Sequence, residues 1–128
     1  MESIVIEGTK ISPKINFDYE KGLIELEGRS LPEQAHDLYK PLIKWVEEYK
    51  LIPRELTTVN LKLEYINSSS NKYILQILKK IDELFKDGNK VAVTWLYDEE
   101  DDDLYETAVE YNDVLTVDIS IEPMEEIN

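Results

Sequence analysis

The N-terminal third of the chain alternates short apolar stretches with turn residues. Residues 3–6, 14–17 and 23–27 predict three short strands. In the third of these, apolar side chains alternate with glutamates, which indicates a strand with only one buried face. Gly22 can adopt a positive φ and therefore predicts a hairpin between the second and third strands. Gly28 predicts the end of the third strand.

A first helix is predicted between Ser30 and Pro53. Ser30 and Glu33 fit a capping box, with Pro32 in the first turn. The apolar positions that share one face at helical spacing are Leu38, Leu42, Trp45, Val46 and Tyr49. Pro41 interrupts this run and predicts either a kink or a division into two helices.

The clearest alternation lies in residues 57–65, which predict a strand, and a second helix follows. The strand residues predicted to face inward are Val59, Leu61, Leu63 and Tyr65. Residues 67–71 are a cluster of N-cap residue types, and Gly88 predicts the end of the helix. The predicted buried stripe is Ile74, Ile77, Leu78, Ile81, Leu84 and Phe85, and the predicted water-facing residues are Lys79, Lys80, Asp82, Glu83 and Lys86.

The last third of the chain predicts two more strands and a short helix. Residues 91–97 predict an apolar strand, and an acidic run follows at residues 98–103. The third helix is predicted from apolar residues at i, i+4 and i+7, namely Leu104, Ala108 and Tyr111. Residues 115–121 alternate again and predict a final strand, and residues 123–128 predict a loose tail.

The order of these elements predicts the fold class. Strands alternate with helices after the first hairpin, which is typical of a largely parallel sheet. In three strands, apolar residues alternate cleanly with polar ones, whereas a sheet covered on both faces would have continuous apolar strands. We therefore predict a two-layer α/β domain, with a mixed β-sheet of four to six strands and helices on one face. A length of 128 residues predicts a single domain over residues 1–128.

Charge is distributed unevenly along the chain. Residues 1–90 hold 15 acidic and 14 basic side chains, whereas residues 91–128 hold 13 acidic side chains and no basic one. The net charge of −14 offers no basic footprint for nucleic acid and disfavours binding to an anionic membrane. No apolar run approaches the ~20 residues of a membrane span, and the N-terminus lacks the hydrophobic region of a signal peptide. We expect a soluble protein whose docking partner carries a basic patch.

Residues suited to catalysis are few. The chain has no cysteine, which excludes thiolate catalysis and agrees with a cytoplasmic location. Its single histidine, His36, is not accompanied by the partners of a nucleophilic triad. Its four glycines are too far apart to cradle a phosphate. We therefore expect no enzymatic activity, no catalytic residues and no cofactor.

The acidic run at residues 98–103 leaves one alternative open. Oxygen-rich loops bind calcium or magnesium, and this run follows a strand, where α/β proteins often bind ligands. An EF-hand loop starting at Asp98 needs glycine and glutamate where the sequence has Asp103 and Val109, so that register fails. Solvated surface is the favoured interpretation. A divalent-cation-binding module or cation-dependent enzyme is the alternative function.

Ser68, Ser69 and Ser70 connect the clearest strand to the second helix. Their hydroxyls are placed to accept hydrogen bonds from the free amides of the first helical turn. A phosphate attached here would meet the same amides and the positive end of the helix dipole. Local physics alone favours capping over phosphorylation.

Several stretches between about residues 10 and 110 occur in a distinctive order. They are ISPKINFD at 11–18, GRSLPE at 28–33, YKPL at 39–42 with Trp45 and Tyr49, YINSSSNK at 65–72, and WLYD at 95–98 with the acidic run. In their order and spacing, these stretches resemble the SiaC-type regulatory phosphoproteins. This is a bacterial family whose fold is similar to that of STAS-domain anti-sigma-factor antagonists.

The resemblance implies a phosphorylation site directly after Asn67, at Ser68, with Ser69 as the nearest alternative. Family members often carry threonine at this position. This chain also has Asn71 where the family usually has serine, and Leu31 where it usually has tyrosine. The resemblance further implies partner switching, in which a protein kinase phosphorylates the domain and a PP2C-type phosphatase reverses the modification. The unphosphorylated form would then activate a downstream target such as a diguanylate cyclase.

The surface around Ser68 is expected to meet these partners. The predicted partner-binding residues are Asn67, Ser69, Ser70, Lys72, Arg29, Tyr97, Asp98 and Asp101. Arg29 and Lys72 are the local candidates to neutralise a phosphate, Arg29 only if folding brings it close. No metal ligand is predicted in this set.

Overall fold

The computed structural model describes residues 1–124, which form six strands and three helices. The strands are β1 (Ile4–Ile6), β2 (Lys14–Asp18), β3 (Leu23–Ser30), β4 (Leu56–Ile66), β5 (Lys90–Asp98) and β6 (Ile119–Met124). The helices are α1 (Ala35–Tyr49), α2 (Ser68–Lys86) and α3 (Asp102–Val114). Every strand and helix predicted from the sequence is present, although some of the bounds differ.

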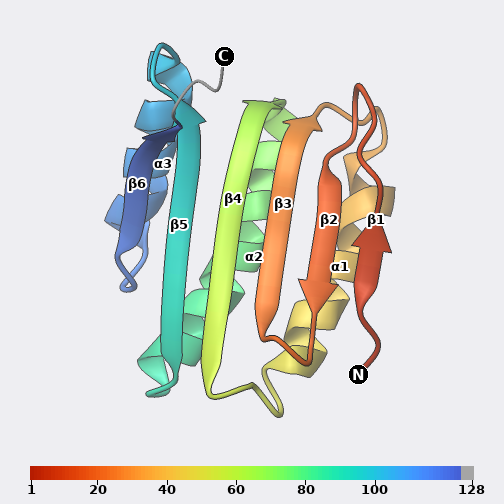
Figure 1. Ribbon diagram of the computed structural model, residues 1–128, viewed down its shortest axis with the longest axis vertical. Helices are drawn as coiled ribbons and strands as arrows, with labels where there is room; N and C mark the ends of the chain where they lie inside the picture. Colours follow the sequence, from red (N-terminus) through yellow and green to blue (C-terminus); the bar gives the residue numbers. More distant parts are fainter. Residues whose placement is uncertain (125–128) are drawn as a thin grey trace.

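The six strands form one mixed sheet in which the strand order equals the chain order (Figure 1). β1, β2 and β3 pair antiparallel, and β3, β4, β5 and β6 pair parallel. Gly22 has a φ of 62° in the connection from β2 to β3, as the predicted hairpin requires. Because β3 to β6 are parallel, their carboxyl ends all lie at the same end of the strands, where α/β proteins place ligand sites.

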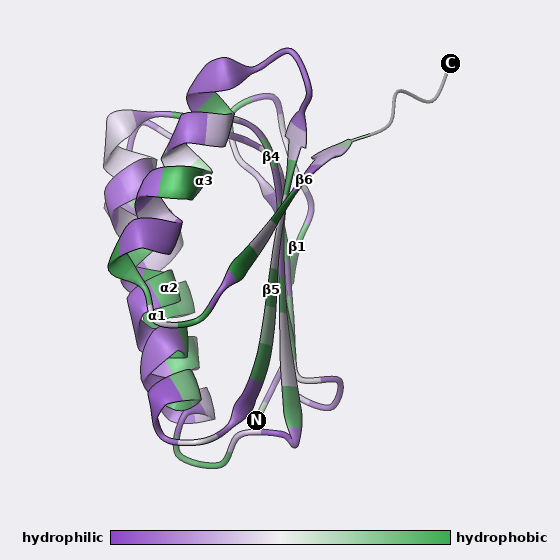
Figure 2. Ribbon diagram, turned by 90° about the vertical axis from the view of Figure 1, so that its left-hand side faces the viewer, coloured by the Kyte–Doolittle hydropathy of each residue, from purple (hydrophilic) through white to green (hydrophobic). Residues whose placement is uncertain are grey.

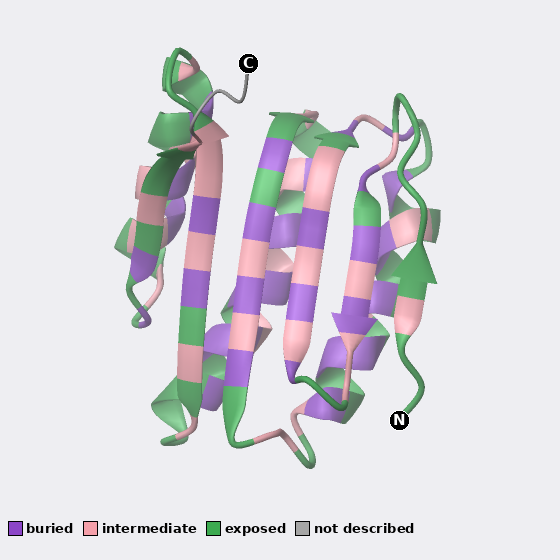
Figure 3. Cartoon of the chain, viewed as in Figure 1, coloured by how far each residue is buried: buried purple, intermediate pink, exposed green. Residues whose placement is uncertain are grey.

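All three helices cover the same face of the sheet, which confirms the predicted two-layer arrangement (Figure 2). Buried residues alternate with partly exposed ones along the central strands, because the second face of the sheet is uncovered (Figure 3). The largest fully buried side chains include Trp95, Tyr39, Tyr49 and Phe17. Among residues 1–124, no helix combines the length and the apolar character needed to cross a membrane.

Two predictions for the junction between β3 and α1 are wrong. β3 continues through Gly28, whose φ of 109° suits glycine, and it ends at Ser30. Ser30 is therefore a buried strand residue and not a helix cap. The helix begins at Ala35, and Gln34 before it makes no side-chain cap. Pro41 does not divide α1, because it lies on the exposed side, where a carbonyl without its helical partner faces solvent.

The final strand begins later than predicted. β6 starts at Ile119 and not at residue 115, because a side chain takes the amides that a strand would use for pairing. The Asp82 carboxylate accepts hydrogen bonds from the amides of Thr116 (3.0 Å) and Val117 (2.8 Å). Asp82 is only 3% exposed, so its predicted place on the water-facing side of α2 is also wrong.

Two further residues near the ends of elements differ from prediction. Phe85, predicted as part of the buried stripe of α2, is 38% exposed. Pro123, predicted in a loose tail, lies within β6. A strand at the edge of a sheet tolerates a residue without an N–H. Residues 125–128 of the predicted tail lie outside the described part of the chain.

Candidate functional site

The N-terminus of α2 is capped by Asn67 and not by the serines that follow it. Asn67 has an extended backbone (φ −81°, ψ 168°), and its side-chain oxygen accepts the Ser70 amide at 2.8 Å. The backbone amide of Asn67 donates to the Ser30 carbonyl at 2.9 Å, which fixes the entry of the chain into the helix. Since Asn67 provides the cap, the hydroxyls of Ser68 and Ser69 are not needed for it.

The three serines have different surroundings. Ser68 and Ser69 are exposed in the first turn of α2, whereas Ser70 is fully buried. The Ser70 hydroxyl accepts a hydrogen bond from Ser30 at 2.8 Å, and Ser30 in turn lies 2.5 Å from the Tyr39 hydroxyl. Ser70 is thus an interior residue, and its predicted role at a partner surface does not agree with this position.

The buried hydroxyls beneath α2 link three elements that no local sequence pattern connects. Ser30 lies at the end of β3, Tyr39 in α1 and Ser70 in α2. Burial raises the pKa of the Tyr39 hydroxyl, and its hydrogen bonds to Ser30 and Ser70 partly oppose this effect. This network was not predicted from the sequence, because Ser30 fits the pattern of a helix cap.

A register shift where β3 pairs with β4 changes which side chains face outward beside the serines. Gly28 pairs with Leu63 but Arg29 pairs with Tyr65, so β4 contains one extra residue at Glu64. This extra residue reverses the alternation. Tyr65, predicted to face inward, is therefore 53% exposed.

The two basic residues expected to neutralise a phosphate are both exposed. Folding brings the Arg29 backbone beside that of Tyr65, three residues before Ser68. Lys72 lies in α2, one turn beyond Ser68. Neither residue lines the cleft next to Ser68, so a group attached to Ser68 would not meet a preformed basic site there.

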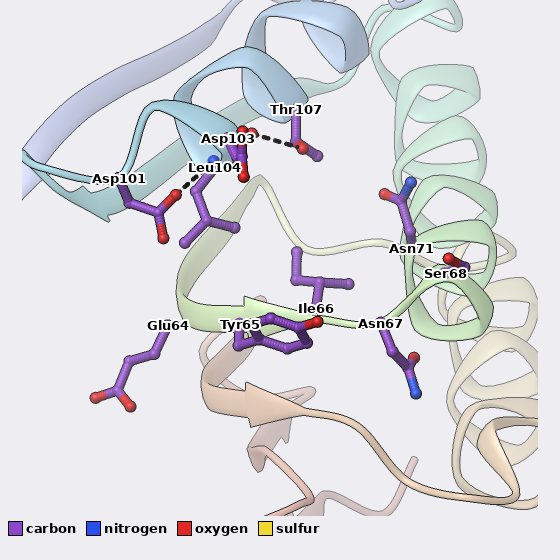
Figure 4. A pocket seen from close by; sticks show the side chains of 10 residues that line it. All are labelled: Glu64, Tyr65, Ile66, Asn67, Ser68, Asn71, Asp101, Asp103, Leu104 and Thr107. Carbon is purple, nitrogen blue, oxygen red and sulfur yellow. Dashed lines mark hydrogen bonds between the residues drawn. The ribbon is translucent and has the colours of Figure 1, made fainter.

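A cleft of about 250 Å³ separates the start of α2 from the start of α3 (Figure 4). Its lining residues are Glu64, Tyr65, Ile66, Asn67, Ser68, Asn71, Asp101, Asp103, Leu104 and Thr107. The cleft lies at the carboxyl ends of β4 and β5, as the strand directions require. The structure therefore brings Asp101 to the same cleft as Ser68, although the two residues are far apart in the sequence.

Tyr97 and Asp98 lie outside this cleft. Asp98 lines a separate, open depression together with Glu100 and residues 101–103. Tyr97 packs against Tyr105 of α3, with ring centroids 5.5 Å apart. Of the three residues predicted to extend the Ser68 surface from β5, only Asp101 does so directly.

The acidic run connects the end of β5 to the first turn of α3, and two of its carboxylates accept backbone amides. The Asp101 side chain caps α3 by accepting the Leu104 amide at 3.1 Å, and Asp98 accepts the Glu100 amide at 2.9 Å. Within residues 1–124, no group of three or more histidine, cysteine, aspartate or glutamate side chains is arranged to hold a metal ion. The alternative of a cation-dependent function therefore has no supporting geometry.

Within residues 1–124, the ion pairs are confined to the first part of the chain. They join Lys50 to Glu83, Arg54 to Glu20, Lys62 to Glu27, Lys80 to Glu47 and Lys86 to Asp82. In the described residues after residue 90, no carboxylate has an ion-pair partner. In the part of the chain that the structure describes, negative charge at the α3 end of the domain is thus not compensated by ion pairs.

These features describe a small α/β domain with an exposed hydroxyl at a capped helix N-terminus, beside a cleft lined with carboxylates. A family model described as SiaC family regulatory phosphoprotein matches residues 6–124. The chain belongs to the SiaC family of regulatory phosphoproteins, as its sequence motifs predict.

Similar proteins come from Pseudomonas aeruginosa. An uncharacterized protein of strain UCBPP-PA14 is 29% identical over 126 residues, which cover 98% of this chain and 100% of the relative. The crystal structure of apo-SiaC is 30% identical and has a TM-score of 0.88, covering 95% of this chain and 99% of SiaC. SiaC in a crystal structure of the diguanylate cyclase SiaD with its activator SiaC is 29% identical, with a TM-score of 0.88, and covers 94% and 99% of the two chains.

Proposed function

We propose that this domain is a phosphorylation switch that controls a diguanylate cyclase. A protein kinase phosphorylates Ser68, a PP2C-type phosphatase removes the phosphate, and the unphosphorylated form binds and activates the cyclase. The domain acts by binding and carries out no catalysis of its own. Its place of action is the cytoplasm.

The observation that carries this proposal is the position of the Ser68 hydroxyl. It is exposed at the first residue of α2, its capping role is already taken by Asn67, and it borders a cleft that can be covered by a partner. The similarity to SiaC, whose structure with the cyclase SiaD has the same fold, supports a cyclase as the target.

Electrostatics support inhibition of binding by phosphate. Phosphorylation adds about −1.5 to −2 charges at neutral pH. The cleft beside Ser68 already holds the carboxylates of Glu64, Asp101 and Asp103, and none of its lining residues is basic. A phosphate at this position would be repelled by these carboxylates and would be costly to cover with a partner surface.

Peptide mapping of protein isolated from its native cell tests the modification itself. We expect phosphate on the peptide that contains residues 67–72, with Ser68 as the modified residue. Phosphate on Ser69 in place of Ser68 would contradict the assignment. No phosphate on this segment under any growth condition would contradict the switch.

A binding assay with the cyclase tests the consequence. Ser68→Asp is expected to weaken binding by about 30-fold or more relative to Ser68→Ala, because an added charge must be buried in the interface. Aspartate is favourable in the first turn of a helix, so the variant keeps its fold. Ser3→Asp is the matched control, since Ser3 is an exposed serine before β1 at the opposite edge of the sheet. Equal binding by Ser68→Asp and Ser68→Ala would rule out the proposal.

A further inference from the structure

Helix α3 is joined to the first turn of α2 by one polar contact. The Tyr111 hydroxyl of α3 donates to the side-chain oxygen of Asn71 and lies 3.1 Å from the Asn71 backbone carbonyl. Burial raises the pKa of Tyr111, so the hydroxyl keeps its proton and remains a donor at neutral pH. The Tyr111 ring also packs edge-on against Trp95 of β5, with centroids 5.4 Å apart.

Asn71 lies on the same side of α2 as Ser68, because residues three apart share a helix face. Both side chains line the cleft, and the carboxylates of Asp101 and Asp103 line it from the side of α3 (Figure 4). A negative charge added to Ser68 therefore shares the cleft with these carboxylates and lies less than one helical turn before Asn71.

Helix α3 is weakly anchored compared with α1 and α2. Only three of its side chains are buried, Leu104, Ala108 and Tyr111, whereas six are buried in α1 and seven in α2. Its N-terminus depends on the Asp101 carboxylate as a cap. An element with few buried apolar groups opens at a lower free energy than the rest of a domain.

We propose, on the basis of the proposed phosphorylation of Ser68, that α3 is the element that responds to the added charge. The Asn71–Tyr111 hydrogen bond is the contact that holds α3 against α2 in the unmodified form. Repulsion of Asp101 and Asp103 by the phosphate then loosens the start of α3 and shifts the acidic surface that a partner would meet. Tyr111 and Asn71 are thus positioning residues for the switch.

Hydrogen–deuterium exchange of the full-length chain tests this inference without any partner. We expect Ser68→Glu to speed amide exchange in residues 102–114 by about fivefold or more, with little change in α1. Asp101→Asn combined with Asp103→Asn should remove most of this effect, because asparagine keeps the capping oxygen but not the charge. Tyr111→Phe should speed exchange in α3 without any added charge.

Tyr39→Phe is the matched control for Tyr111→Phe. It also removes a buried tyrosine hydroxyl bonded toward α2, but from the side of α1. Exchange in α3 should stay within about twofold of the parent in this variant. Equal acceleration of α3 by both tyrosine variants would mean general destabilisation and would overturn the assignment of Tyr111.

The outcomes separate this inference from the proposed function. If Ser68→Glu abolishes cyclase binding but leaves α3 exchange unchanged, the switch stands and the role of α3 is refuted. If α3 exchange rises but cyclase binding does not fall, α3 responds to charge as inferred and the proposed function fails. Acceleration by Ser68→Glu that persists in the double asparagine variant would refute the repulsion mechanism.

Discussion

Replacing Asp82 is the sharpest test of how the C-terminal part of the domain is held. Asp82 is buried in α2, and its carboxylate accepts the backbone amides of Thr116 and Val117 in the loop from α3 to β6. Asp82→Ala removes the acceptor and leaves two amides without their partner, that of the buried Val117 and that of the exposed Thr116. The nearby Lys86 ammonium, 3.6 Å away and 58% exposed, adds little because solvent screens it.

The magnitude follows from the two orphaned donors. A buried amide left unsatisfied costs about 1–3 kcal/mol, and the less buried Thr116 amide costs less, so Asp82→Ala should lower the free energy of unfolding by about 3 kcal/mol. Asp82→Asn keeps one acceptor oxygen but loses the negative charge and the second acceptor oxygen. We expect it to cost about 1–2 kcal/mol.

Urea denaturation followed by circular dichroism measures both losses. With a slope of about 2 kcal/mol/M, the midpoint of Asp82→Ala should fall by about 1.5 M, and that of Asp82→Asn by about half as much. Glu106→Ala, an exposed acidic residue of α3, is the control and should stay within about 0.5 kcal/mol of the parent. A midpoint for Asp82→Ala within error of this control would refute the reasoning.

Three further predictions follow from the buried hydroxyls and the charge distribution. Ser30→Ala leaves the hydroxyls of Tyr39 and Ser70 without their shared partner and should destabilise the domain by about 1–2 kcal/mol in urea titrations; a loss below about 0.5 kcal/mol would contradict the network. Burial raises the pKa of Tyr39 and of Tyr111 above the usual value of 10.0. The contribution of the two protonated tyrosines to stability is therefore complete below about pH 10 and is lost as the pH rises further, so the thermal midpoint should fall at alkaline pH. An unchanged midpoint between pH 9 and pH 11 would argue against this contribution. Cyclase affinity should weaken as salt is raised from 50 to 500 mM, because the acidic run at residues 98–103 attracts a basic surface; salt-independent affinity would exclude that attraction.

The parts of the fold that the sequence predicted well are those with a local cause. The start of α2 was predicted within residues 67–71 because these are all N-cap residue types and a 3.6-residue apolar pattern follows from Ile74. The helices were predicted to cover only one face of the sheet because apolar and polar residues alternate within the strands. This alternation can be read from each strand's own sequence. The resemblance to the SiaC family also depended on contiguous motifs.

The errors have a common physical cause, which is pairing between distant residues. Asp82 looked like a surface residue because its partners are backbone amides 34 and 35 residues further along the chain. Ser30 matched a capping pattern, but the pairing of β3 with β4 extended the strand through it. For the site, the sequence indicated Ser68 and Asp101 separately, and only the parallel pairing of β4 with β5 places them at one cleft.

The strand order of the sheet has one consequence for the first encounter with a partner. Because the strands lie side by side in the order of the chain, the charge imbalance along the sequence becomes a charge imbalance across the molecule (Figure 1). The β1 edge belongs to a nearly neutral segment, whereas the β6 edge belongs to a segment that has only acidic side chains among its charged residues. The domain therefore has a permanent electric dipole directed across its strands. In the field of a basic partner, this dipole turns the α3 and β6 edge toward the partner before any contact forms.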